Sequence, residues 1–437
     1  MSNAEALATQ DVPARPAGGT NSVLVISSGN PEVDWLAGEL SRRGDLRTLV
    51  RRYANLGRRW EKVLAQVPGI GNAFSNAMGL RVLLPAQDPS QVVEAGIAYD
   101  FLSAAMVRSG LGRLGLAGSD LCSRLKKDSI ARKGASSLGS AKVVVGNYGV
   151  SWRAFERIKQ RGGRAVLNYP NAHHRFQQRF LAEEAEREPE FAAAFSNEIS
   201  ASAQVFDREC ELADTILVGS SFVRRTFQDS GLNADKLAVV PYGCDVSMFA
   251  PREDRGSEDV FRAIFVGQLA QRKGLSYLLK GYRAFQGPGT ELLLAGRLVG
   301  DPAALVPYKD SFTALGVVSH SRLPELYRQA DVFLFPTLIE GMPLVVLEAM
   351  ASGLPVITTN HGPGDIVRDG VDGFIVPIRD PEAIADRLEA LRSNPEMRIA
   401  MGQSARARAL EFTWERYCTR AADAVLGGGL AAATRGA

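Results

Sequence analysis

Two glutamates lie eight positions apart in the segment PTLIEGMPLVVLEAMASGLPVITTN, residues 336–360. Glu340 stands beside a glycine in a loop-like stretch, whereas Glu348 stands inside an apolar run. A carboxylate in such a run must be either exposed or hydrogen-bonded, because an unpaired buried charge is costly. Ligand hydroxyls are suitable partners, so this pair of carboxylates could hold a polyhydroxylated molecule such as a sugar.

The surrounding residues predict a strand, a loop and a helix in direct succession. The run DVFLFPT (331–337) predicts a strand that ends near Pro336. Pro343 suits the first turn of a helix, and Gly353 followed by Pro355 ends that helix after Ala351. Glu340 is therefore expected in the loop at the carboxyl end of a strand, where ligands bind in parallel α/β sheets.

The same loop has features of an anion site. Gly341 would let the backbone approach a ligand closely, and the free N–H groups of Leu344 and Val345 would face a phosphate. A phosphate at the helix start with hydroxyls on either side describes a nucleotide-sugar, in which Glu340 holds the sugar and Glu348 the ribose. The alternative is a solvated Glu348 and an ordinary loop acid at Glu340. The Gly, Pro and strand context favours the site.

Similar apolar runs recur along all 437 residues and alternate with helix-length amphipathic segments. Short, nearly continuous apolar runs are typical of parallel strands that are buried on both faces. The predicted fold class is therefore α/β, built from βαβ units. The expected strands are SVLVISS (22–28), AKVVVGN (141–147), GRAVLNY (163–169), TILVGSS (215–221), RAIFVGQ (262–268), ELLLAGR (291–297), DVFLFPT (331–337), LPVITTN (354–360) and GFIVPI (373–378).

The polar stretch 242–260 interrupts this alternation and divides the chain into two Rossmann-like domains, residues 21–245 and 256–411. Residues 1–20 are rich in Ala, Pro and Gly and are expected to be disordered, as is a flexible tail over 428–437. A helix over 412–427 is expected to pack back on the first domain. Gly29, just after the first strand, could shape an acceptor or phosphate loop.

Several segments in the correct order resemble family 4 of the retaining glycosyltransferases, which has the GT-B fold. Residues 340–348 resemble its E-x7-E signature, and FVGQLAQRKGLSYLLKGY (265–282) resembles its G-R-L-x-x-x-K-G segment. VVPYGCDVSMFAP (239–251) resembles its P-N-G-V-D-x-x-x-F-x-P linker, with Tyr242 in place of Asn. The resemblance covers residues 205–425 and is weak before them, where the acceptor would bind.

The resemblance implies a cleft between two domains that binds a nucleotide-diphosphate sugar. The usual Arg after Gly267 is Gln268 here, so Arg272 and Lys273 are assigned to the donor phosphates. No D-x-D motif is present, and the nearest match, Asp207-Arg208-Glu209, is expected on a helix surface; no metal cofactor is expected. The implied donor-binding residues are Gly267, Arg272, Lys273, Glu340, Gly341, Met342, Leu344, Val345 and Glu348.

Two adjacent histidines follow the strand 163–169. Similar enzymes have a histidine here that faces the donor sugar, so the implied catalytic residues are Glu340, Lys273 and His174. His174 is preferred to His173 because adjacent side chains of an extended segment point in opposite directions. A structural role for either histidine remains an equal alternative, and His320 and His361 are interpreted as loop residues.

Residues 41–64 place arginines among apolar residues at helical spacing. Two interpretations stay open: a helix that binds anionic lipid headgroups at a membrane face, or a solvated helix whose apolar side lies in the core. No nucleic-acid-binding motif accompanies the charge. The expected location is the cytoplasm or the cytoplasmic face of a membrane, because no secretory signal and no long apolar segment is evident.

The expected reaction is transfer of a sugar from a nucleotide-diphosphate donor to a glycan or lipid-linked hydroxyl, with retained anomeric configuration, in surface polysaccharide or glycolipid synthesis. Two rivals use the same fold. A nucleotide-sugar epimerase would turn over donor without acceptor, and a non-catalytic subunit would bind nucleotide-sugar without chemistry. The presence of Glu340, Lys273 and Glu348 argues against the second rival, although Gln268 departs from the family pattern.

Overall fold

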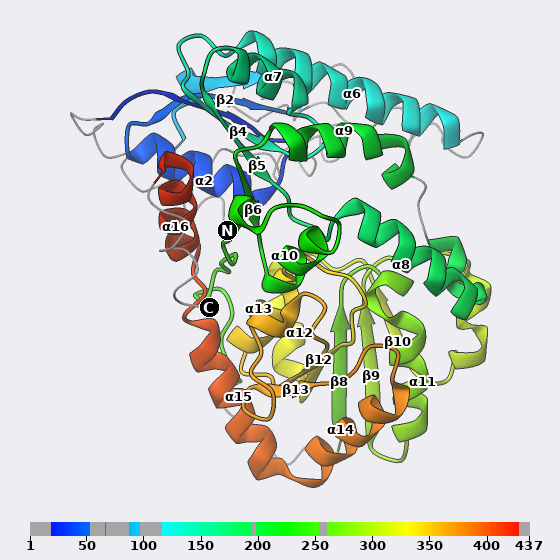
Figure 1. The fold of residues 1–437 in the computed structure, drawn as a ribbon. Coiled ribbons are helices and arrows are strands. Elements are labelled where there is room, and N and C mark those ends of the chain that lie inside the picture. Colours follow the sequence, from blue (N-terminus) through cyan, green and yellow to red (C-terminus); the bar gives the residue numbers. More distant parts are fainter. Residues whose placement is uncertain are drawn as a thin grey trace. The chain divides into compact units, whose positions relative to one another are not determined.

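A computed structural model describes residues 19–52, 66, 87–96, 116–194, 198–252 and 260–427 (Figure 1). The predictions for 1–18, 53–64 and 428–437 therefore lie outside the described residues. The chain forms two compact units. The first holds the described residues up to Tyr169, together with Gln204–Leu217 and the residues from Cys418 onward, whereas the second holds Pro170–Ala203 and Val218–Tyr417.

The first sheet has the strand order β3-β2-β1-β4-β5-β6-β7. The pairings that join β3 through to β6 are all parallel. Most of its inner strands are apolar and buried along their length, as in the VLVI of β1, which explains why helices are needed on the faces of this sheet. The strands are β1 (Val23–Ile26), β2 (Leu46–Arg51), β3 (Val92–Glu94), β4 (Val143–Asn147), β5 (Arg164–Asn168), β6 (Thr215–Val218) and β7 (Leu237–Val239).

The second sheet has the order β10-β9-β8-β11-β12-β13, and every pairing in it is parallel. Helix α11 (Leu275–Phe285), which follows β8 in the chain, packs against α14 (Pro381–Ser393), and both are labelled in Figure 1. The strands are β8 (Phe261–Val266), β9 (Thr290–Ala295), β10 (Thr313–Gly316), β11 (Val332–Phe335), β12 (Val356–Thr358) and β13 (Gly373–Ile375).

Helices stand between many of the successive strands, and in the described part of the chain three helices follow the last strand, β13. In the described residues the helices are α2 (Pro31–Arg42), α6 (Leu116–Ser136), α7 (Trp152–Gln160), α8 (His174–Arg187), α9 (Glu198–Leu212), α10 (Ser221–Gln228), α11 (Leu275–Phe285), α12 (Leu323–Gln329), α13 (Leu344–Ala351), α14 (Pro381–Ser393), α15 (Pro395–Ala409) and α16 (Trp414–Leu426). Residues 418–426 of α16 belong to the first unit, where Asp423 pairs with Arg43.

Both sheets are doubly wound, and the order of connection reverses between β1 and β4 in the first sheet and between β8 and β11 in the second. A reversal separates the loops at the carboxyl ends of two neighbouring strands, and that gap is where ligands bind in such sheets. The loops that follow β8 and β11 carry Lys273 and Glu340. The fold therefore places these two residues at the expected binding position of the second sheet.

The nine strands predicted from apolar runs are confirmed, with ends that differ by a few residues. The helix predicted over 41–64 is wrong where it can be described, because Leu46–Arg51 form strand β2. A turn at Gly44, whose φ is +76°, separates β2 from the preceding helix, and Leu46, Leu49 and Val50 are buried in the sheet. The sequence pattern did not indicate this strand, because arginines interrupt its apolar residues. Among the described residues, no helix combines the length and the apolar character needed to cross a membrane.

Candidate active site

The loop after β8 turns sharply into α11. It contains a short 3-10 turn, η5 (Gln271–Lys273), that ends at Gly274 with a left-handed φ of +76°. A Cβ at Gly274 would lie 1.9 Å from the carbonyl oxygen of Pro336, so only glycine allows this loop to touch the end of β11. The backbone N–H groups of Leu338 and Ile339 also donate to the carbonyl oxygen of Arg272, at 3.0 and 3.1 Å. The two loops are therefore in direct backbone contact.

This contact brings together three charged residues that the sequence analysis assigned to the site. Lys273 and Arg272 both form ion pairs with Oε1 of Glu340. The side chains of Lys273 and Glu340 are only 10% and 12% exposed, whereas that of Arg272 is 38% exposed. The Lys273 ammonium also lies 5.0 Å from the ring centre of Phe335. Two cations thus share one nearly buried carboxylate.

The electrostatics of this group follow from burial and proximity. Burial lowers the pKa of Lys273 to about 8, although the adjacent Glu340 acts in the opposite direction. Burial raises the pKa of Glu340, but the charges of Lys273 and Arg272 outweigh it and hold the pKa below its usual range. At neutral pH the group is therefore two cations and one anion. Its net positive charge suits a ligand with more negative charge than Glu340 supplies.

Gln268, the departure from the family pattern, has a defined contact. Its side-chain oxygen accepts a hydrogen bond from the Arg272 guanidinium at 3.0 Å. Arg272, four residues later in the same loop, therefore lies beside Gln268, and its assignment to the charge that an arginine at position 268 would bring stays a prediction. Gly267, which precedes Gln268, has a φ of +144° and leaves β8 in a conformation that favours glycine.

Gly341 and Met342 pack against the polypeptide itself. A Cβ at Gly341 would lie 1.6 Å from the carbonyl oxygen of Pro170, so close approach of the chain already requires glycine here. Ser220 donates a hydrogen bond to the Gly341 carbonyl at 2.6 Å, and Met342 is 5% exposed. The proposed approach of Gly341 to a ligand stays a prediction, and packing is a second reason for this residue.

Helix α13 begins at Leu344, with Pro343 at the N-cap rather than inside the first turn as predicted. No side chain caps this helix end. The Val346 N–H donates a hydrogen bond to the carbonyl oxygen of the N-cap residue, Pro343, at 3.2 Å. The N–H groups of Leu344 and Val345 lie ahead of it, where a helix terminus attracts anions. The assignment of these two residues to a phosphate stays a prediction.

Glu348 is buried, with 6% of its surface exposed, and both carboxylate oxygens are hydrogen-bonded. His320 Nε2 lies 2.9 Å from Oε1, and the Tyr327 hydroxyl donates to Oε2 at 3.3 Å. The alternative of a solvated Glu348 is therefore wrong. His320 stands in the turn η7 (His320–Arg322), and hydrogen bonding to Glu348 raises its pKa above the usual value. The sequence analysis missed this role because the partners are 28 residues apart.

The segment HGPGD (361–365) is a second part that the sequence analysis did not assign to the site. The Glu340 N–H donates to the His361 carbonyl oxygen at 3.1 Å, and Gly362 has a φ of +128°. A Cβ at Gly362 would lie 2.7 Å from the Cβ of Glu340. The His361 ring stacks on Phe222 with centroids 4.5 Å apart, and burial lowers its pKa. The glycine-rich motif was a usable signal for a loop that supports Glu340.

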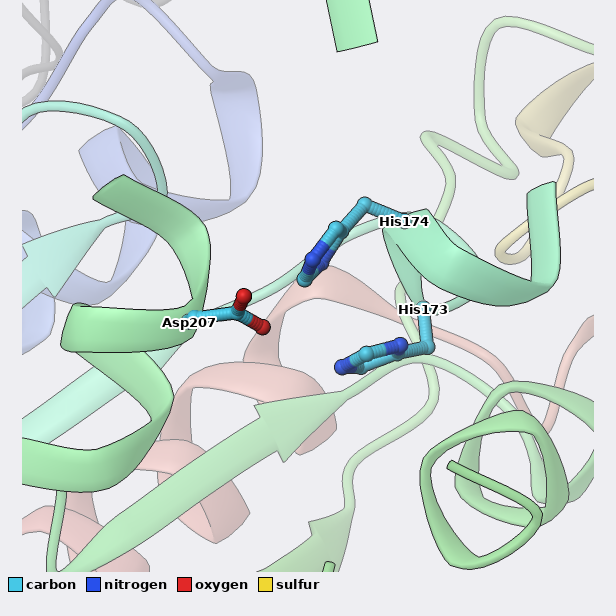
Figure 2. A group of neighbouring side chains, drawn as sticks. All are labelled: His173, His174 and Asp207. Carbon is cyan, nitrogen blue, oxygen red and sulfur yellow. The ribbon is translucent and has the colours of Figure 1, made fainter. Parts of the chain in front are cut away.

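His174 is the first residue of α8 and His173 is its N-cap, whose Nδ1 accepts from the Arg175 N–H at 3.3 Å. Both histidines are 1% exposed, and their ring centroids lie 4.3 Å apart (Figure 2). The argument that only one of them points inward is wrong, because the pair spans a helix start and not an extended strand. Asp207 in Figure 2 belongs to α9 in the first unit, and we assign no metal site to residues drawn from both units. The catalytic assignment of His174 stays a prediction.

Gly29 follows β1 at the switch point of the first sheet and has a left-handed φ of +99°. Its N–H donates to the Ser27 hydroxyl at 3.1 Å. On both sides of this turn, Ser28 and Asn30 share hydrogen bonds with the side-chain amide of Asn147, the last residue of β4. Polar groups therefore gather at the expected ligand-binding edge of the first sheet, and the acceptor role of Gly29 stays a prediction.

The segment Asp207-Arg208-Glu209 lies in helix α9, as predicted, but Glu209 is not on the surface. Its carboxylate is fully buried and accepts from the N–H groups of Gly149, Ser151 and Trp152 at the start of α7, at 2.5 to 3.1 Å. Burial raises the pKa of Glu209 to about 7, although these N–H groups oppose the rise. Glu209 caps a helix within the first unit, which explains why a charged residue was retained there.

Comparison with known proteins shows what the chain is similar to. Residues 250–408 match the family model of the glycosyl transferases group 1. The D-inositol 3-phosphate glycosyltransferase of Corynebacterium glutamicum is 33% identical over 204 residues, 41% of this chain and 49% of that protein. The chain spans about half the length of the curated relatives it matches first.

Solved structures match almost the whole chain at low identity. Sucrose-phosphate synthase of Thermosynechococcus elongatus has a TM-score of 0.61 and 18% identity, over 94% of this chain and all of that one. Alr3699/HepE of Anabaena, solved in complex with UDP, has a TM-score of 0.60 and 15% identity, over 93% of this chain and all of that one. The chain therefore has the GT-B fold of these proteins, and its residues 250–408 are similar to the glycosyl transferases group 1.

Proposed function

We propose that the protein is a glycosyltransferase that moves a sugar from a nucleotide-diphosphate sugar to a hydroxyl of a glycan or lipid-linked acceptor. The observation that carries this proposal is the Arg272–Lys273–Glu340 group at the switch point of the second sheet, beside the uncapped start of α13. Two cations and a helix N-terminus suit a diphosphate, and carboxylates on either side suit hydroxyls.

The comparisons support the same reading. The group 1 family model covers the residues that form this site, and curated relatives are glycosyltransferases by name. The structural neighbour Alr3699/HepE was solved in complex with UDP and, separately, in complex with UDP-glucose. We therefore propose a nucleoside-diphosphate sugar as donor, and a role in surface polysaccharide or glycolipid synthesis for the product.

In the proposed course, the donor diphosphate takes Arg272 and Lys273 away from Glu340. The freed Glu340 carboxylate then accepts hydrogen bonds from hydroxyls of the transferred sugar, and Glu348 accepts from the ribose. The bond between the anomeric carbon and the phosphate oxygen breaks as the acceptor oxygen bonds to the same carbon from the same face. The acceptor proton passes to the departing phosphate, whose charge Lys273 and Arg272 stabilise. Retention of configuration follows from attack on that face.

We propose that no metal is needed, because Arg272 and Lys273 supply the positive charge that a metal would otherwise bring. Transfer measured in a metal-chelating buffer is then expected to stay within about twofold of the rate with added Mg²⁺, a difference of less than about 0.5 kcal/mol in activation free energy. Loss of activity on chelation, restored by one metal ion, would contradict this part of the proposal.

The first test is thermal unfolding in the presence of UDP-, GDP-, ADP- and dTDP-linked sugars. A ligand that binds the native state raises its stability, so one class of donor is expected to raise the midpoint. Glu348→Ala should abolish the rise, whereas Glu325→Ala, at an exposed position of α12, should keep it. No rise with any donor, with or without Mg²⁺, would overturn the proposal. Donor turnover without acceptor would indicate an epimerase, and binding without any turnover would indicate a non-catalytic subunit.

A further inference from the structure

Glu184 is a completely buried carboxylate outside the group already described. It lies in α8 and has no exposed surface. Its Oε1 accepts hydrogen bonds from the Gln271 amide at 2.8 Å and from the Tyr277 hydroxyl at 2.7 Å. Its Oε2 accepts from Arg379 Nε at 2.7 Å. A buried charge is retained only when such donors compensate for lost hydration, so these contacts specify the position of Glu184 closely.

The Gln271 contact links α8 to the loop that carries the two cations. Gln271 is itself fully buried. Its amide nitrogen also donates to the Ser276 hydroxyl at 2.6 Å, and its side-chain oxygen accepts from the Ser276 N–H at 3.0 Å. Gln271 is the first residue of η5, and Arg272 and Lys273 follow it directly. Any shift of Gln271 is therefore passed to both cations through one short turn.

Arg379 holds the opposite side of Glu184. Its backbone has a φ of +63°, a left-handed conformation that is unfavourable for a non-glycine residue and persists only when the surroundings enforce it. Its guanidinium lies 4.5 Å above the ring of Phe180 and also pairs with Glu183 at 2.9 Å. A strained residue is thus kept so that a cation reaches Glu184.

The place of α8 in the chain makes this link unusual. Helix α8 lies between β5 and β6, which belong to the first sheet, yet Pro170–Ala203 cluster with the second unit. The same helix begins with His174, which was predicted to face the donor sugar. Glu184 therefore joins the element that carries His174 to the element that carries Lys273, both within the second unit.

We infer that Glu184 is a positioning residue for the donor diphosphate: through Gln271 it fixes the turn that presents Arg272 and Lys273. The inference rests on the proposed function, since it assigns a support to the same site. If Glu184 acts in this way, its substitution weakens the binding of ligands that carry phosphates and leaves the binding of ligands without phosphates unchanged. Substitution of a residue that only stabilises the fold changes the affinity for both kinds of ligand or for neither.

The test compares Glu184→Gln with Glu183→Gln by calorimetric and NMR titration. Glu183 is the neighbouring residue, 47% exposed, and pairs with the same Arg379, so it is a matched control. The ligands are UDP with uridine, and GDP with guanosine as a second pair. Glu184→Gln is expected to weaken the diphosphate about tenfold, because small displacements of positioned groups have large effects, and to change the nucleoside less than about twofold. Glu183→Gln should change neither.

Equal weakening of nucleoside and diphosphate in Glu184→Gln, or no weakening of either, would overturn the inference. If wild-type protein binds neither diphosphate, the proposed function fails first, and the two failures are thereby distinguished. Should Glu184→Gln not fold, Tyr277→Phe removes one of the three hydrogen bonds and keeps the ring. It is expected to give the same selective loss of diphosphate affinity on a smaller scale, and equal changes for both ligands would again contradict the inference.

Discussion

Lys273 and Glu340 form an ion pair in which neither partner is well hydrated. Such a pair stabilises a protein only weakly, whereas loss of one partner leaves a buried charge uncompensated. The pair also has a use in binding, because a diphosphate can replace the carboxylate on the cations without new burial of charge. The free protein thus keeps its cations aligned by an internal anion.

Glu340→Gln tests whether the charge of Glu340 compensates Lys273, because it replaces one carboxylate oxygen by an amide nitrogen. The substitution removes the charge that compensates Lys273, and the free energy of unfolding is expected to fall by about 1 to 3 kcal/mol in urea titrations. Transfer is expected to fall by at least about 10²-fold, because the sugar hydroxyls lose their charged acceptor. Glu325→Gln, at an exposed site, should change neither quantity. Transfer within a few-fold of wild type would show that the site is assigned wrongly.

The His320–Glu348 contact predicts a pH dependence of nucleotide affinity. The hydrogen bond to Glu348 raises the pKa of His320 above its usual value of 6.5. When the ribose hydroxyls replace His320 as hydrogen-bond partners of Glu348, the pKa of His320 returns toward its usual value. Binding of the nucleotide therefore releases a proton from His320. UDP affinity should therefore rise with pH above 6.5 until His320 is neutral in the free protein. Above about pH 8 the affinity should fall, as Lys273 loses its charge.

His320→Gln serves as the control for this titration. The variant is expected to lose the rise of UDP affinity above pH 6.5. It is expected to keep the fall of UDP affinity above about pH 8, which Lys273 causes. Calorimetric titration of UDP between pH 6 and 9 measures both limbs in wild type and variant. Identical curves for the two proteins, or a wild-type affinity that falls from pH 6.5 upward, would contradict exchange of His320 for ribose on Glu348.

Single residues were predictable where their signal is local. Glu340, Glu348 and Lys273 stand beside glycines, prolines and apolar runs that define a strand, a turn and a helix. His320 and Glu184 gave no such signal, because their hydrogen-bond partners are 28 and 87 residues away. Gly362 had a local signal in its glycine-rich motif, which the sequence analysis did not assign to the site. The pairing of His173 with His174 was misjudged, since a helix start turns adjacent side chains to the same side.

At the scale of elements, the site depends on two loops that touch. Gly274→Ala would add a Cβ 1.9 Å from the Pro336 carbonyl oxygen, at a φ of +76°. We expect the free energy of unfolding to fall by at least about 3 kcal/mol, since backbone conformation and contact are both disfavoured. Gly316→Ala is the matched control, because its φ is +66° and nothing lies within 4 Å of the added atom.

The control is expected to lose only about 1 to 2 kcal/mol, the cost of the left-handed conformation alone. The difference between the two variants in urea titration measures the contact between the loops. Equal losses would show that the loops can separate at little cost. UDP affinity should fall in Gly274→Ala and stay unchanged in Gly316→Ala.

Buried strands were the most predictable elements, because both of their faces must be apolar. β2 was the clearest error: its sequence LRTLVR mixes arginines with apolar residues, and the segment 41–64 around it has arginines and apolar residues at helical spacing. The strands β3, β7 and β10 were not predicted, and β10, with the sequence TALG, is mostly exposed and has no apolar run. Tertiary pairing, which no local pattern contains, defines these elements.

At the scale of the whole molecule, every described residue assigned to the donor lies in the second unit. We expect calorimetric scans to resolve two unfolding transitions. UDP at about 100 times its dissociation constant should raise the second unit's stability by about 2.7 kcal/mol and its midpoint by about 5 °C. The other transition should stay in place, and Glu348→Ala should remove the shift. A single transition that moves as a whole would contradict independent unfolding of the units.

The left-handed backbone at Arg379 has a consequence for inheritance. A lineage that lost the carboxylate at Glu184 would leave the Arg379 guanidinium without its buried acceptor, and only Glu183 and the Phe180 ring would then hold a side chain at a φ of +63°. Glycine is the residue that such a position would then accept. Descent would therefore exchange Glu184 and Arg379 together, and related chains that lack the glutamate would be expected to carry glycine at the position of the arginine.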